Sequence, residues 1–126
     1  MKTKSKIKYQ KWDLKRKRLK YHLKKKNVIG LPRLVIFRSN NNIFSQLVDD
    51  KENKTILSVS SIDKELKDVI GKAKSKIEKS TIVGKAIAEK MQKANIEKII
   101  LDRNGYKYHG RVKAVGEAVR SENIQI

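Results

Sequence analysis

Residues 33–48, RLVIFRSNNNIFSQLV, contain two apolar runs separated by a polar segment. The first run is rich in β-branched and aromatic side chains, which predicts a buried strand over 33–38. SNNN at 39–42 predicts a tight turn, because asparagine tolerates left-handed backbone angles and both residue types can hydrogen-bond their own backbone. The second run predicts a strand over 43–48, so the whole stretch indicates a β-hairpin.

The sequence that follows predicts a third strand and a short helix. DDKENK at 49–54 is typical of a turn, and TILSVS at 55–60 predicts a strand that completes a three-stranded meander. Apolar residues at helical spacing then predict an amphipathic helix over 62–70 that ends at Gly71. These apolar residues are Ile62, Leu66, Val69 and Ile70.

A longer helix and a further strand are expected in the second half. Ser80 or Thr81 can cap the helix, and Asn95 suits the left-handed position at its C-terminus. The apolar stripe of this helix consists of Val83, Ile87, Met91 and Ala94. KIIL at 98–101 then predicts a strand that is buried on both faces.

The last predicted helix starts near Arg111 and has three valines on one face. Isoleucines at 124 and 126 allow a short terminal strand. Together the elements predict an α/β fold, in which helices pack on a three-stranded meander extended by a further strand. If this further strand lies parallel to its neighbour, the crossover should be right-handed.

Positive charge is concentrated at the N-terminus. The chain has 126 residues and a formal net charge of +19. Residues 1–26 hold 13 of the 32 Lys and Arg but only one acid, Asp13, which makes +12 of that total. Like charges repel, so we expect this segment to stay extended or mobile until an anionic partner neutralises it. Trp12, Leu19 and Leu23 lie near helical spacing, and the alternative of a helix formed on binding stays open.

The chain therefore divides into a basic extension over 1–26 and a single α/β domain over 27–126. Its charge favours nucleic acid over an anionic membrane or an acidic protein. No apolar run is long enough to span a bilayer, and no apolar region follows the basic N-terminus as in a secretory signal. Cysteine is absent, which excludes disulfides and thiolate metal sites and fits a reducing compartment such as the cytoplasm.

The segment DRNGYKYHGRVKA, residues 102–114, could form a catalytic loop, an anion-binding loop or a structural turn. Catalysis has little support. Asp102 and Glu117 could approach each other, but no metal-binding motif of defined spacing is present. His109 has no nucleophile motif to activate. We expect neither enzymatic activity nor a cofactor or metal.

Anion binding explains more of this loop. Gly105 and Gly110 permit positive φ and close approach of another backbone, and the second of them opens a helix whose free N–H groups suit a phosphate. Arg103 and Arg111 flank the loop and can each bind a phosphate through two donors. The loop's two tyrosines could stack on ribose or bases. The alternative is an ordinary turn with both tyrosines packed on the core.

Two stretches, RLVIFRSNNNIFSQLVDD (33–50) and LDRNGYKYHGRVKAVGEAVR (101–120), resemble the signature stretches of the bacterial-type large-subunit ribosomal protein L18 family, which binds 5S rRNA. The resemblance extends over essentially the whole chain, including the basic N-terminal segment. Asn95 and Asn104 stand where glycine is frequent, and asparagine is the next-best residue for a left-handed conformation.

The resemblance implies a structural constituent of the large ribosomal subunit that binds 5S rRNA and helps attach it to 23S rRNA in the central protuberance. It implies an α/β fold with a ribonuclease H-like motif that lacks that enzyme's active site. The expected partners are 5S rRNA, 23S rRNA and neighbouring 5S-binding and central-protuberance proteins, with no membrane and no homo-oligomer. The expected location is the cytoplasmic 50S subunit, with an organelle matrix as the alternative.

The residues expected to contact RNA lie in the basic segment, the hairpin and the glycine-flanked loop. They are Lys15, Arg16, Lys17, Arg18, Lys20, Tyr21, Lys24, Arg33, Arg38, Ser39, Asn40, Asn41, Arg103, Tyr106, Tyr108, His109, Gly110 and Arg111. A rival hypothesis of another class is a nucleoid-type DNA-packaging protein, which would use the same basic segment but show little preference for RNA over duplex DNA.

Overall fold

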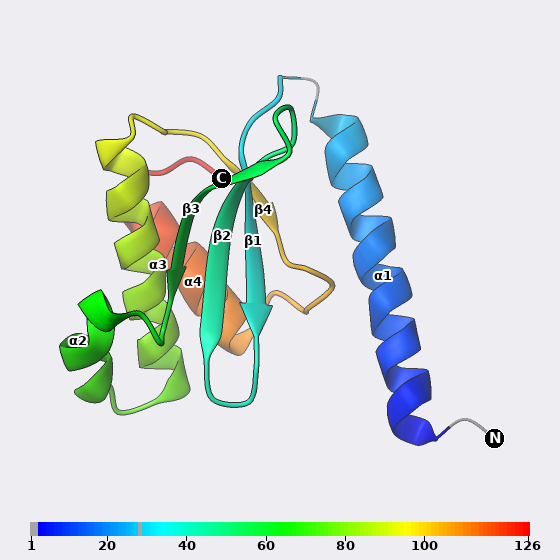
Figure 1. Cartoon of the computed structure of the whole chain (residues 1–126), viewed down its shortest axis with the longest axis horizontal. Helices are drawn as coiled ribbons and strands as arrows, with labels where there is room; N and C mark the ends of the chain where they lie inside the picture. Colours follow the sequence, from blue (N-terminus) through cyan, green and yellow to red (C-terminus); the bar gives the residue numbers. More distant parts are fainter. Residues whose placement is uncertain (1–2, 28) are drawn as a thin grey trace.

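Figure 1 shows the fold in a computed structural model, which describes residues 3–27 and 29–126. The elements follow one another in the order α1 (Lys4–Lys26), β1 (Arg33–Arg38), β2 (Ile43–Asp49), β3 (Lys54–Ser60), a 3-10 turn (Lys64–Leu66), α2 (Lys67–Gly71), α3 (Lys76–Lys93), β4 (Ile100–Asp102) and α4 (Gly110–Ser121). This mixed α/β architecture confirms the predicted fold class. Residues 1, 2 and 28, which include the start of the predicted extension, lie outside the described part.

The four strands form one sheet in the order β3-β2-β1-β4. The first three are antiparallel neighbours, which confirms the meander, and β4 adds to β1 in parallel, with Leu34 opposite Leu101. Between Leu47 and Val48 the pairing with β3 shifts by a bulge. The carboxyl ends of β1 and β4 therefore point to the same end of the sheet, where the hairpin turn and the loop after β4 begin.

The hydrophobic core lies between the sheet and helices α3 and α4. Leu34 and Ile36 of β1 and Leu47 of β2 are fully buried against the apolar stripes of both helices. The two helices approach each other closely at Gly84, where an added Cβ would lie 2.7 Å from both the Ala118 Cβ and a backbone oxygen of α4. A glycine is therefore required at this helix crossing.

Helix α3 begins earlier than predicted. Its N-cap is Ser75, whose hydroxyl accepts from the Glu78 backbone N–H at 3.1 Å. Ser80 and Thr81 lie inside the helix and donate to carbonyl oxygens one turn back. The prediction that one of them caps the helix was wrong, since Ser75 already satisfies the first turn. Ala94, placed on the buried stripe, is exposed at the C-cap.

The segment after β3 also differs from its prediction. Instead of one amphipathic helix over 62–70, a 3-10 turn leads into the short helix α2. Ile62 is 63% exposed and Val69 50% exposed, so half of the expected apolar stripe faces solvent. Asp63 accepts hydrogen bonds from the Ser60 backbone N–H and hydroxyl, which fixes a turn where the continuous helix was expected to begin.

Of the C-terminal predictions, the end of α3 and helix α4 are confirmed, and the two strands are corrected. Asn95 has a φ of 59° and ends α3 as expected. Within KIIL, only residues from Ile100 onward join the sheet, and Ile100 and Leu101 are half-buried rather than covered on both faces. The terminal strand reduces to a single parallel bridge between Lys98 and Gln125. Helix α4 carries its buried valines as predicted.

The basic N-terminal segment is a helix of 23 residues rather than an extended arm. The Thr3 hydroxyl caps it by accepting from the Lys6 backbone N–H at 3.2 Å. Asp13 pairs with Arg16 at 2.7 Å and with Lys17 at 3.0 Å, which offsets part of the repulsion among the basic side chains. In Figure 1 the helix stands beside the loop that follows β4, apart from α3 and α4. Among the described helices none is long and apolar enough to cross a bilayer.

Candidate nucleic-acid interface

Arg33 is held inside the protein by two carboxylates. It is 6% exposed, and its Nε and Nη2 donate to the two oxygens of Asp50 at 3.1 and 3.0 Å, while its Nη1 donates to Asp102. Burial disfavours its charge, but the hydrogen bonds that it donates to both carboxylates raise the pKa of Arg33. All three side-chain nitrogens of Arg33 are therefore engaged within the protein, which gives this residue a structural role, and its contact with RNA stays a prediction.

The same cluster shapes the loop after β4. Asp102 is fully buried and accepts from the Asn104 backbone N–H at 2.8 Å through its other oxygen. Asn104 and Gly105 follow with positive φ values of 56° and 84°. The chain turns sharply at these two residues. Both carboxylate oxygens of Asp102 thus accept hydrogen bonds within the protein. Among the described residues, no group of three or more His, Cys, Asp or Glu side chains could hold a metal ion.

Helix α1 packs on this turn at Gly105. A Cβ added there would lie 3.1 Å from the Trp12 Nε1 and 3.3 Å from the Arg16 Cα. The close approach expected of this glycine is therefore made by the protein's own helix. The indole N–H of Trp12, the Nε of Arg16 and the side-chain oxygen of Asn104 are buried here without a hydrogen-bond partner.

Aromatic and guanidinium groups link the helix to the hairpin. Trp12 stacks on Tyr106 with ring centroids 5.5 Å apart and an interplanar angle of 29°. Arg38, at the end of β1, lies over the other ring of this pair, 4.8 Å from the Tyr106 centroid. Arg16 lies 5.1 Å from the Trp12 ring centroid. We call Trp12, Tyr106 and Arg38 the stacked column; it joins α1, the loop and β1.

Polar contacts join the hairpin turn to the start of α4. The Arg111 guanidinium donates to the Ser39 carbonyl oxygen at 2.7 Å. The hydroxyl of Tyr106 donates to the Arg38 carbonyl oxygen at 3.4 Å. Asn40 and Asn41 at the tip of the turn are exposed. The two signature stretches, far apart in the sequence, therefore form one continuous surface.

Helix α4 opens on this surface. Its N-cap is His109, whose side chain makes no capping bond, and its first residue is Gly110 with a φ of 56°. His109 is exposed and Gly110 half-buried. The first N–H groups of a helix are free to bind an anion, so the predicted arrangement of glycine, histidine and helix N-terminus is present.

Both tyrosines of the loop pack partly against the core. The Tyr108 hydroxyl donates to Glu117 at 3.4 Å, and its ring covers Gly116, where an added Cβ would lie 2.7 Å from that hydroxyl. Burial, followed by the negative charge of Glu117, raises the pKa of Tyr108. Tyr106 lies within the stacked column. Packing against the core therefore buries part of both tyrosine rings, as expected for a structural turn.

A basic groove lies between α1 and the loop. It encloses about 260 Å³ and is lined by Lys15, Arg18, Leu19, His22, Arg103 and Gly105. Lys17, Tyr21 and Lys24 are exposed on α1 as well. Lys20 instead is half-buried near Asp102: burial lowers its pKa, and the carboxylate opposes that shift. The structure thus brings together most of the residues predicted from separate stretches.

Trp12 and Asp50 were missed as organising residues. The sequence did contain a signal for Trp12. Tryptophan is highly buried on average, so a tryptophan within a lysine-rich segment indicates that this segment packs on the rest of the protein. Nothing in the sequence showed that Asp50 would pair with Arg33, since their contact depends on the register of β1 and β2.

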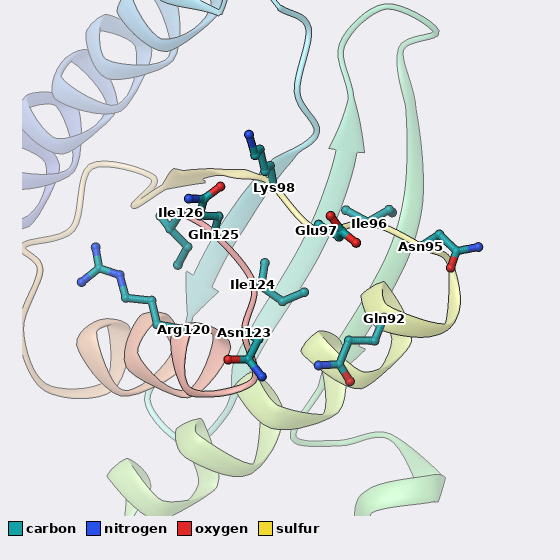
Figure 2. Close-up of a pocket in the computed structure, with 10 residues that line it drawn as sticks. All are labelled: Gln92, Asn95, Ile96, Glu97, Lys98, Arg120, Asn123, Ile124, Gln125 and Ile126. Atoms are coloured by element: carbon teal, nitrogen blue, oxygen red, sulfur yellow. The ribbon is translucent and has the colours of Figure 1, made fainter.

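A separate hollow of about 810 Å³ lies at the C-terminal ends of α3 and α4 (Figure 2). Figure 2 shows Gln92 and Asn95 on one side of it and Arg120 and Ile126 on the other. The C-terminal end of α3, which borders it, lies at the end of the sheet opposite the hairpin turn (Figure 1). The hollow therefore is not part of the surface built by α1, the hairpin and the loop.

Comparison with known proteins agrees with this geometry. Residues 6–126 match the family described as ribosomal L18 of archaea, bacteria, mitochondria and chloroplasts. The chain belongs to the ribosomal L18 family. It is 43% identical to the large ribosomal subunit protein uL18 of Mycoplasmopsis pulmonis, over 88% of this chain and 91% of that protein. The uL18 proteins of Petrotoga mobilis and Brevibacillus brevis are 42% and 43% identical, over 90% and 93% of this chain and 95% and 98% of theirs.

Membership of the L18 family makes this a ribosomal protein and part of a ribonucleoprotein that acts in translation. The family match begins at residue 6, so the similarity includes most of α1 as well as the α/β body.

Proposed function

We propose that this ribosomal protein is a structural constituent of the large subunit that binds 5S rRNA and helps attach it to 23S rRNA in the central protuberance. The observation that carries the proposal is the continuous surface formed by α1, the hairpin turn and the glycine-flanked loop. Within that surface the stacked column and the Arg111–Ser39 hydrogen bond fix the relative positions of donors from all three segments.

Two kinds of contact are expected on this surface. Exposed cations of α1, chiefly Lys15, Lys17 and Arg18, neutralise phosphates, and the release of counterions supplies much of the binding free energy. Arg103 faces the same groove from the loop. The hairpin turn and the start of α4 supply donors at fixed positions, which read the shape and riboses of a folded RNA because the major groove of A-form RNA is closed to side chains.

The distribution of charge supports an attachment to 23S rRNA. The chain has a formal net charge of +19, and exposed lysines extend along α1 beyond the groove. Cations that do not face 5S rRNA are available to a second RNA and to neighbouring ribosomal proteins of the central protuberance.

The test compares 5S rRNA with duplex DNA and with an unrelated RNA hairpin as ligands, over a range of salt concentrations. We expect 5S rRNA to bind most tightly at every salt concentration. Replacing Lys15, Lys17 and Arg18 with glutamine should lower the slope of log affinity against log salt by about one unit per lost phosphate contact. The control replaces Lys85, Lys90 and Lys93 of α3 with glutamine, which removes the same amount of charge outside the proposed RNA surface and should leave the salt slope nearly unchanged.

Equal affinity for all three ligands would instead support a DNA-packaging protein. A salt slope that falls equally for both triple variants would show that only net charge matters, and it would remove α1 from the proposed RNA surface.

A further inference from the structure

Asn104 and Gly105 form the one Asn-Gly pair of the sequence. Asparagine is among the thermally labile residues of proteins. It is most labile before glycine, because no side chain shields the backbone nitrogen of a glycine from the asparagine amide. The pair lies in the loop between β4 and α4, directly under helix α1. A chemical change at this pair would therefore alter the contact between the helix and the loop.

The folded loop restricts both members of the pair. Asn104 is 3% exposed, and its backbone N–H donates to the Asp102 carboxylate at 2.8 Å. A Cβ added to Gly105 would lie 3.1 Å from the Trp12 Nε1 and 3.3 Å from the Arg16 Cα. In Figure 1 helix α1 runs beside this loop. The hydrogen bond and the helix thus prevent the Asn104 side chain from swinging onto the Gly105 backbone nitrogen.

The cover that α1 provides is weak. Over the whole described length of the helix, Lys4–Lys26, no side chain is buried. At the contact itself, the Trp12 Nε1, the Arg16 Nε and the Asn104 Oδ1 are buried without a hydrogen-bond partner. Buried polar groups of this kind carry a desolvation cost that weakens an interface. Because segments held by few buried contacts open at a lower free energy than the core, α1 should open more often than the body unfolds.

We propose that Asn104 is a deamidation site and that the docking of α1 protects it. When α1 opens, the Gly105 backbone nitrogen attacks the Asn104 Cγ. The N–Cγ bond forms, the Cγ–Nδ2 bond breaks, and the amide proton of Gly105 leaves with Nδ2 as ammonia. Water then adds to the cyclic succinimide, with its hydroxyl on either ring carbonyl carbon and its proton on the ring nitrogen. The ring opens to aspartate or isoaspartate, and the new carboxyl group ionises at neutral pH.

The isoaspartate product is incompatible with the turn. Its main chain runs through Cγ, which lengthens the backbone between Asp102 and Gly105 by a carbon atom. The turn depends on positive φ values of 56° at Asn104 and 84° at Gly105. A longer backbone displaces Gly105 from its place under Trp12, so α1 separates from the loop. Since the ammonia is lost to solvent, the change is permanent.

The experiment follows the conversion of the full chain in mildly alkaline buffer by mass spectrometry of peptides that contain residues 104–105. The parent chain unfolded in urea gives the unprotected rate, and the folded parent should convert far more slowly. Trp12→Leu loses an aromatic stacking contact with the loop, so the folded variant should convert about 2- to 13-fold faster than the folded parent. Asn104→Gly keeps a residue that tolerates positive φ, and it should show no conversion.

The matched control is Val83→Ala, which truncates a fully buried side chain of α3 away from α1. This variant should convert at the rate of the parent. An equal acceleration in Val83→Ala and Trp12→Leu would show that only global unfolding exposes Asn104, and it would overturn the protective role of α1. Equal rates in the folded and unfolded parent, or no conversion of Trp12→Leu, would overturn the proposal as well.

Hydrogen exchange of the Gly105 amide measures the same opening in the unsubstituted chain. The fraction of time that this amide is open should equal the ratio of the folded to the unfolded conversion rate. An amide that opens much more often than this ratio allows would show that the opening of α1 does not control the reaction. This readout does not depend on the folding of any variant.

Discussion

Arg33 shows how a residue that suits RNA by type can be required for the fold. Its side chain links the turn after β2 to the end of β4 through Asp50 and Asp102. A buried ion pair contributes little net stability by comparison with apolar packing, but removing one partner is costly because the other stays buried and charged. The cluster therefore fixes the loop after β4, because Asp102 also accepts a hydrogen bond from the Asn104 backbone N–H of that loop.

The first prediction concerns Asp50→Asn. The hydrogen bonds from Arg33 lower the pKa of the Asp50 carboxyl, so its ionised form stabilises the folded state. We expect the variant to lose about 1.5–3 kcal/mol of unfolding free energy near neutral pH. The stabilisation by the ionised carboxylate is fully present above the pKa of the unfolded state, about 4. It is lost as the pH falls through the lower pKa of the folded state.

Thermal unfolding at a series of pH values checks this prediction. The difference between the parent and the variant should be constant near neutrality and should narrow below about pH 4. Glu89→Gln, at an exposed carboxylate of α3, is the control and should show little difference. A difference that stays constant down to the lowest pH would contradict the role of Asp50.

At the scale of elements, the docking of α1 on the loop decides the shape of the proposed interface. Contact is made at Gly105, which has a φ of 84° and faces the Arg16 backbone. The ring of Trp12 then covers Tyr106. A long basic helix gains most of its stability in water from such tertiary packing.

The second prediction concerns Gly105→Ala. Alanine is strained at this positive φ by about 1–2 kcal/mol, and its methyl group would press against Trp12 and Arg16. We expect α1 to detach partly, with a red shift of the emission of Trp12, the chain's one tryptophan. Gly71→Ala is the matched control, since nothing lies within 4 Å of its added Cβ. Identical spectra for both variants would show that α1 does not depend on this contact.

Sequence alone predicted the strands of the meander, because short apolar runs rich in β-branched residues alternate with turn residues, and it predicted α4 from valines at helical spacing. The start of α3 could have been predicted, since Ser75 and Glu78 have the spacing of a capping box. The helical state of α1 could not be decided, because residues within the segment repel one another and the stabilising contact with Tyr106 comes from the far end of the chain.

At the scale of the whole molecule, the candidate site unites segments that the sequence shows as separate. The basic segment, the hairpin turn and the glycine-flanked loop were each predicted from their own residues. That Trp12, Tyr106 and Arg38 stack in one column depends on the parallel pairing of β1 with β4, which brings the last two segments together. Family membership and this geometry support one RNA-binding surface rather than three independent contacts.

The most direct test of this account is a double-mutant cycle on 5S rRNA affinity, with Trp12→Leu in α1 and Arg38→Gln in the hairpin. Both side chains contact the ring of Tyr106, so each should lose part of its contribution when the other is absent. We predict a coupling free energy of about 0.5–3 kcal/mol. Losses that add to within about 0.3–0.5 kcal/mol would show that helix and hairpin bind RNA independently, and would contradict the single surface.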